Sequence, residues 1–148
     1  MNHPSLLLLS VAVGVMVVIQ GGINSRLGVL LDNSLLATSV ALVTGASLTL
    51  IAVFLSVRQL PQADQLKSIP SYLWFAGGVL SFLAVTLFYY LIPRLGISTA
   101  VTFGLTGQII FAAIAAHYGW FGMPVEVISV RKILGIAVLI VGLMIIKY

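Results

Sequence analysis

Ionised side chains are almost absent from long stretches of this 148-residue chain, and they lie singly between apolar runs. Only 7% of the residues are charged and 61% are hydrophobic, with a mean hydropathy of +1.21. A soluble domain normally has about a quarter of its residues charged. A helix needs about 20 apolar residues to cross the ~30 Å hydrocarbon core of a bilayer. The chain contains several such runs, so it is predicted to be an integral membrane protein.

Five apolar segments predict five transmembrane helices in a single all-α domain that spans residues 1–148. We expect the membrane spans at about 6–31, 35–57, 73–92, 97–116 and 131–147. Asp32-Asn33-Ser34 supplies turn and N-cap residues between the first two spans. The longest polar stretch, 58–72, is expected to lie outside the hydrocarbon, and Pro93 to Gly96 is expected to break the chain between the third and fourth spans. The apolar start of the chain lacks a basic n-region, so it is predicted to be a span rather than a signal peptide.

Positive charges are almost equally divided between the two sides of this five-span topology. One side has four lysine or arginine residues, Arg58, Lys67, Arg131 and Lys132. The other side has three, Arg26, Arg94 and Lys147. The Lys/Arg imbalance between loops sets the orientation of a membrane protein. A division of four against three therefore predicts insertion in both orientations, and the alternative is a single topology with the four-charge side in the cytoplasm.

Several function classes are excluded by composition and motifs. The chain has no cysteine, so it has no disulfide framework and no cysteine nucleophile. Its basic residues form no stripe, so nucleic-acid binding is not expected despite a net charge of +4. Metal-ligand spacings, phosphate-binding loops and nucleophile motifs are missing, so we predict neither an enzyme nor a bound cofactor or metal. The acidic residues, Asp32, Asp64 and Glu126, all fall outside the predicted spans, so a carboxylate proton switch within the membrane is not expected.

Polar side chains within the predicted spans are the candidate solute-binding residues. Gln20 and Asn24 lie one helical turn apart on the first span, and Gln108 lies near the middle of the fourth. An uncharged amide is a good donor and acceptor for a polar or cationic solute, and it suits binding better than bond-making chemistry. The predicted lining of the site is Gln20, Asn24, Gln108 and Thr106, with Phe82 and Tyr89 as apolar or aromatic walls.

Each of these residues also has a purely structural interpretation. The amides can hydrogen-bond one helix to another, and Thr106 can bond back to its own helix. Tyr89 lies near a span end, where aromatic residues are common. Outside the predicted lining, Arg26 can pair with Asp32 or extend to lipid headgroups, and the alternative is a site role for an anionic solute. His117 is either an ordinary interfacial residue or a pH-sensitive gate.

Glycines recur every seven residues on two of the spans. They are Gly14, Gly21 and Gly28 on the first span, and Gly135 and Gly142 on the fifth. Small residues allow the close backbone approach that holds helices together in lipid, so this spacing predicts packing faces. The fifth span has no polar side chain between its terminal lysines, which suits a scaffold or a dimer contact rather than a solute pathway.

Several short motifs together resemble one known family. They are Gln20-x3-Asn24-x2-Leu27-Gly28, Gly45, Trp74, Gly77-Gly78, Pro93-Arg94-Leu95-Gly96, Gly107-Gln108, and Phe121-Gly122 before Pro124. The combination covers essentially the whole chain and resembles the DUF606 (YdcZ-type) branch of the drug/metabolite transporter superfamily. The resemblance implies a five-helix unit equivalent to half of a ten-helix transporter, in the bacterial cytoplasmic (inner) membrane. It also implies that the first, third and fourth helices line the central cavity.

With the balanced charges, this resemblance implies a transporter of small metabolites or drug-like solutes. Two copies inserted in opposite senses would form an antiparallel homodimer that works by alternating access. The alternatives are a small dual-topology channel and a non-transporting helper subunit. The expected partners are a second copy, membrane lipid and a small solute. Relatives often have an aspartate just before the position of His117, where this chain has Ala116, so a coupling role of that residue does not transfer.

Overall fold

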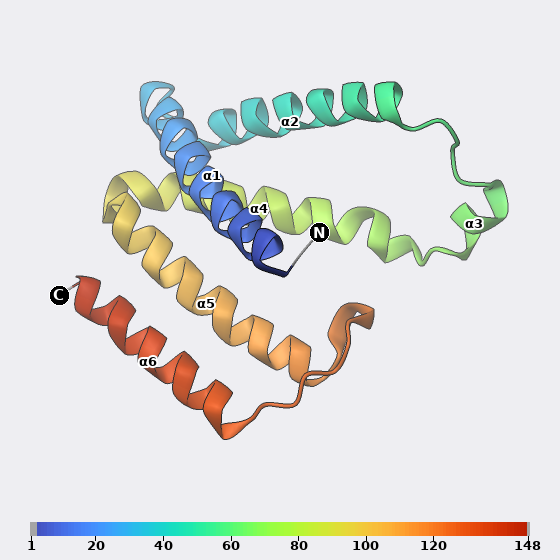
Figure 1. Ribbon diagram of the computed structural model, residues 1–148. Helices are drawn as coiled ribbons and strands as arrows, with labels where there is room; N and C mark the ends of the chain where they lie inside the picture. Colours follow the sequence, from blue (N-terminus) through green and yellow to red (C-terminus); the bar gives the residue numbers. More distant parts are fainter. Residues whose placement is uncertain (1–2, 148) are drawn as a thin grey trace. The chain divides into compact units, whose positions relative to one another are not determined.

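The computed structural model describes residues 3–147, and every regular element within that range is a helix (Figure 1). In chain order these are α1 (His3–Leu30), α2 (Ser34–Ser56), α3 (Ala63–Ser68), α4 (Ser71–Leu95), α5 (Ile97–His117), the 3₁₀-helix η1 (Trp120–Gly122) and α6 (Val130–Lys147). Four of them, α1, α2, α4 and α5, are long and apolar enough to cross a membrane. A helix satisfies its own backbone hydrogen bonds, which lipid cannot do. The predicted all-α membrane architecture is therefore confirmed.

The turn between α1 and α2 consists of three residues, 31–33. The Asn33 side chain caps α2, because its Oδ1 accepts hydrogen bonds from the backbone N–H groups of Leu35 at 2.9 Å and Leu36 at 3.3 Å. The Asn33 N–H in turn donates to the Gly28 carbonyl of α1 at 2.9 Å. Asp32 has a φ of 50°, a left-handed conformation that aspartate and asparagine tolerate better than most residues. The predicted turn is confirmed, and its residue types explain its geometry.

The helix was expected to break at Pro93 to Gly96, and this expectation is corrected in one respect: α4 continues through Pro93 to Leu95. Proline lacks the backbone donor that would bond the Tyr89 carbonyl, so α4 gives up one hydrogen bond there and ends two residues later. The same turn gains a side-chain bond, since Arg94 Nη1 donates to the Tyr90 carbonyl at 2.7 Å. The chain leaves helical geometry at Gly96, whose φ of +82° is accessible to glycine.

The chain divides into two compact units, Met1–Arg94 and Leu95–Tyr148. In the first unit, α1 packs on α2 next to the turn, where Ala37 and Thr38 are almost completely buried. A Cβ atom on Gly28 would lie 3.4 Å from the Ser34 Cα, and one on Gly21 would lie 2.8 Å from Phe88 Cε1 of α4. The predicted packing role is thus confirmed for Gly21 and Gly28.

In the second unit, α5 contacts α6, and Ala113 and Ala115 of α5 are buried. The two helices are joined by residues 118–129, which include η1. A Cβ atom added at Gly135 or Gly142 of α6 would have no neighbouring heavy atom within 4 Å, and the same holds for Gly14 of α1. A packing role for these three glycines stays a prediction.

Most of the apolar surface of each span is not covered within its own unit. In the most apolar 18-residue window of each of the four membrane-length helices, only 6% to 11% of the residues are buried. A helix that is apolar all round and unburied needs lipid or another protein against it. Within its own unit, each of these helices therefore leaves nearly all of its apolar window uncovered.

Candidate functional site

Asn24 and Tyr89 form a hydrogen bond where α1 crosses α4 (Figure 1). Asn24 Nδ2 donates to Tyr89 Oη at 2.9 Å, and the tyrosine is 3% exposed. Gly21 lies one turn earlier on α1 and leaves room for Phe88 and Ile92 of α4. The glycine allows the two helices to approach, and the approach brings the amide and the phenol together. Two of the predicted site residues are thus direct neighbours.

The depth of this pair follows from its position along the helices. Asn24 precedes the end of α1 at Leu30 by six residues, and Tyr89 precedes the end of α4 at Leu95 by six. At 1.5 Å per residue, both lie about 9 Å from their helix ends. The Asn24–Tyr89 pair is therefore closer to one membrane face than to the middle of a ~30 Å hydrocarbon core.

Gln20 and Gln108 lie deeper. Gln20 precedes Leu30 by ten residues, which is about 15 Å along the helix, and Gln108 lies at the middle of α5. Both side chains are exposed, and neither has a hydrogen-bond partner among the described residues. The structure therefore puts these two amides at half-depth on the surfaces of their own units.

The remaining predicted site residues behave differently from one another. Phe82 lies on α4 two turns before Tyr89 and is 42% exposed. Thr106 Oγ1 donates to the Thr102 carbonyl of its own helix at 2.8 Å, which is the structural interpretation considered from the sequence. Thr86, which the predicted lining omits, has a buried Oγ1 without a hydrogen-bond partner in the described part of the chain. Its helical spacing from Phe82 and Tyr89 is the sequence signal that points to it.

A cavity of about 450 Å³ lies within the first unit at the ends of three helices. It is lined by the end of α1, the α1–α2 turn, the start of α2 and the last turns of α4, with Asp32, Asn33, Tyr89, Tyr90 and Arg94 among its residues. The predicted wall residue Tyr89 therefore borders this cavity. We call it the rim cavity. The Arg94 guanidinium carbon lies 3.5 Å from the centroid of the Tyr90 ring, a cation–π contact that holds the side chain in place. The sequence analysis did not predict this cavity.

In the second unit, the loop between α5 and α6 is tied back to the end of α5. The Glu126 N–H donates to the Ala116 carbonyl at 2.9 Å, and the Ile128 N–H donates to His117 Nδ1 at 3.3 Å. His117 therefore has a structural bond to the loop. Lys132 Nζ donates to Glu126 Oε2 at 2.8 Å, and this hydrogen bond and the lysine charge lower the pKa of the Glu126 carboxyl.

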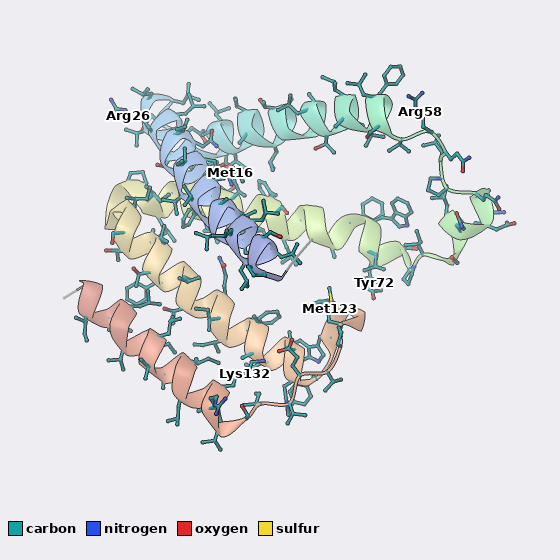
Figure 2. The ribbon with its side chains drawn as sticks, viewed as in Figure 1. Met16, Arg26, Arg58, Tyr72, Met123 and Lys132 are labelled. Atoms are coloured by element: carbon teal, nitrogen blue, oxygen red, sulfur yellow. The ribbon has the colours of Figure 1, made fainter. Side chains whose placement is uncertain are left out.

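Arg26 and Asp32 do not form an ion pair. In the described part of the chain the ion pairs are Lys67–Asp64 at 4.0 Å and Lys132–Glu126 at 2.8 Å. Figure 2 shows the Arg26 side chain projecting outward from the end of α1, as a side chain that extends toward headgroups would. No group of three or more histidine and acidic residues that could hold a metal gathers within the described residues.

These features define the class of the protein, a multi-pass α-helical membrane protein with polar side chains in its spans. Residues 5–145 match the family described as "Putative inner membrane exporter, YdcZ". Since the match covers nearly the whole chain, the protein belongs to the YdcZ family, and the family resemblance of the sequence motifs is confirmed. The chain is a multi-pass transporter of the inner membrane, from a family of transporters rather than enzymes. Searches of curated proteins and of solved structures returned no match.

Proposed function

We propose that the protein exports a small metabolite or drug-like solute by alternating access, as an antiparallel homodimer of two oppositely inserted copies. Each copy contributes five spans, with α6 as the fifth. Gln20, Asn24 and Gln108 from both copies line the solute site, Thr106 lies beside them, and Phe82 and Tyr89 form its walls.

The observation that supports this proposal most strongly is the state of the two glutamines. Hydroxyl groups on α2 bond back to their own helix, as Ser47 does to Val43 and Thr49 to Gly45, both at 2.9 Å. Gln20 and Gln108 have no such bond and are exposed at half-depth. An unpaired amide in an apolar environment costs about 1–3 kcal/mol. A polar cavity shared with a second copy removes this cost for both glutamines.

The balanced positive charges support opposite insertion of the two copies. α6 has 18 residues, a length of about 27 Å, and its first turn contains two basic residues, Arg131 and Lys132, that can extend to headgroups. A fifth crossing by α6 puts the two chain ends on opposite sides of the membrane. Two inverted copies are then related by a two-fold axis in the membrane plane, as in inverted-repeat transporters.

Depth decides which residues meet in such a dimer. Inversion leaves the midplane in place, so Gln20 and Gln108 of both copies share one depth. The Asn24–Tyr89 pairs are instead carried to opposite faces, one above and one below the glutamines. This arrangement suits alternating access, because one solute site then lies between two equivalent walls that open in turn.

The topology is tested with single cysteines, since the native chain has none. Gln62→Cys, in the exposed link between α2 and α4, is labelled in intact cells with a membrane-impermeant maleimide. We expect about half of the protein to react from outside, because a balanced charge gives no preferred orientation. Labelling with a membrane-permeant maleimide measures the total amount of reactive protein. Labelling that is complete or absent from outside would contradict dual insertion.

The solute site is tested by a thermal-shift screen of the purified protein against small metabolites and cationic dyes. A compound that raises the melting temperature should lose its effect in Gln20→Ala and in Gln108→Ala, and keep it in Gln59→Ala, a control in the exposed link after α2. An unchanged shift in the first two variants removes these residues from the site. In liposomes, saturable counterflow of that compound supports a carrier, and uncoupled flux supports a channel.

A further inference from the structure

We propose that the rim cavity binds a zwitterionic group, with an anion at Arg94 and an ammonium at Asp32. The headgroup of phosphatidylethanolamine and a free zwitterionic solute share this chemistry. The proposal depends only on the location of the chain in a membrane, and it does not depend on dual insertion or on the transport mechanism.

The two charges of the cavity are both available to a ligand. Asp32 and Arg94 line the same cavity, yet the ion pairs of the described residues do not include them. The Asp32 carboxylate has no hydrogen bond within the described part of the chain. A guanidinium has five N–H donors, and Arg94 uses one of them on the Tyr90 carbonyl. A zwitterionic ligand can therefore place its anion at the Arg94 guanidinium and its cation at the Asp32 carboxylate.

The Arg94 side chain and the Asp32 backbone are held by bonds that a ligand does not need to break. The Tyr90 ring and carbonyl fix Arg94 at 3.5 Å and 2.7 Å. The Asp32 N–H donates to the Val29 carbonyl at 3.1 Å within the tight turn. The side-chain oxygen of Asn33 accepts the capping hydrogen bonds of α2, so it does not compete for the ligand's cation. Preorganised charges lower the entropy lost on binding.

The position of the cavity favours a lipid headgroup over a solute bound at mid-depth. It lies at the last turn of α1, the first turn of α2 and the last turn of α4. Because α1 and α2 are consecutive spans joined by a three-residue turn, these ends lie at one membrane face, at the level of the phosphates. A volume of about 450 Å³ is in the range of small-molecule sites.

The test measures lipid retention by native mass spectrometry. The full chain is purified in detergent with equal amounts of phosphatidylethanolamine and phosphatidylglycerol. We expect the wild type to retain the zwitterionic lipid preferentially. Arg94→Gln should retain about tenfold less of it, because a charge-assisted hydrogen bond to the phosphate is lost. Asp32→Asn should abolish the preference between the two lipids, and asparagine tolerates the left-handed backbone at this position.

Two controls match these variants in charge. Arg26→Gln removes an arginine near the end of α1 that does not line the cavity, and Asp64→Asn removes an exposed acid of α3. Both should retain lipid as the wild type does. Helical circular dichroism and gel-filtration elution report whether Arg94→Gln still folds. The Asp32→Asn result tests the site separately, because the change keeps the shape of a side chain that makes no hydrogen bond or ion pair within the described residues.

A competition arm distinguishes the two sources of the zwitterion. Free glycine and free phosphoethanolamine are added at millimolar concentration to lipid-loaded protein. Retained lipid supports the headgroup as ligand, and displacement that depends on Arg94 and Asp32 supports a soluble zwitterion at the same site. Equal lipid retention by the wild type, Arg94→Gln and Asp32→Asn would overturn the proposal, as would an equal loss in Arg26→Gln.

Discussion

The α1–α2 and α5–α6 connections join pairs of long helices by different chemistry. The first needs three residues, 31–33, and is closed by backbone bonds and the uncharged Asn33 cap. The second uses residues 118–129 and is closed by a backbone bond from Glu126 to Ala116 together with side chains. These side chains include His117, the Glu126–Lys132 ion pair and aromatic contacts such as Phe111 with Trp120 at 5.8 Å between ring centroids. The first unit is therefore sensitive to side-chain volume at Gly21, and the loop of the second is sensitive to charge as well as to volume, since a Cβ atom on Gly119 would lie 2.8 Å from Val125 Cγ2.

The largest expected effect is on packing in the first unit. Gly21→Leu should lower the free energy of unfolding by about 1–3 kcal/mol, because even a Cβ atom would lie 2.8 Å from Phe88 Cε1. Gly135→Leu, in open space on α6, is the matched change in the second unit and should cost less than about 0.5 kcal/mol. Unfolding by SDS titration in mixed micelles measures both. An equal cost at the two positions would contradict a packing role that Gly21 has and Gly135 lacks.

A smaller effect is expected for the hydrogen bond between α1 and α4. Tyr89→Phe removes the acceptor of Asn24 and should cost about 0.6–1.7 kcal/mol, the range of polar contacts between membrane helices. In the second unit, Thr106→Val removes a bond within one helix and should be close to neutral. A double-mutant cycle of Asn24→Ala with Tyr89→Phe isolates the coupling. A coupling of zero would show that the bond does not hold the helices together.

The smallest effect concerns pH and the loop of the second unit. The pKa of Glu126 is lowered from its ordinary value of 4.5 by its bond to Lys132, so the ion pair stabilises the closed loop above that value. This contribution is lost as the pH falls through the lowered pKa. Iodide quenching of Trp120, in a Trp74→Phe background, should therefore be constant near neutral pH and increase below about pH 4.5. Glu126→Gln should remove this step, and a step that persists in that variant would assign it to another group.

The sequence was sufficient to predict the helices because lipid imposes a minimum length of apolar residues. Each of the four membrane-length helices ends within three residues of its predicted boundary. The helical continuation through Pro93 was missed because proline favours a helix end without enforcing one, and α4 gives up one backbone bond there and continues to Leu95. The seven-residue glycine spacing predicted a packing face on α1, but it did not indicate that α4 contacts that face at Gly21 and leaves Gly14 open.

The candidate site was predictable only in its residue types. The half-depth positions of Gln20 and Gln108 follow from the spans, whereas the Asn24–Tyr89 bond depends on where α1 crosses α4 in space. Residues separated by 65 positions share no sequence pattern that would indicate their contact. The rim cavity was equally hidden, since it needs Asp32 in a left-handed turn and a helix that reaches Arg94.

The three-residue turn also has a consequence for biosynthesis. Helices α1 and α2 are paired at Gly28 and Ala37, so they can leave the translocon as one hairpin. Within the hairpin, residues 3–56, Arg26 is the single arginine or lysine, and the next one along the chain is Arg58. The hairpin itself therefore carries almost no charge signal for its own orientation, and any stronger bias has to come from residues outside it.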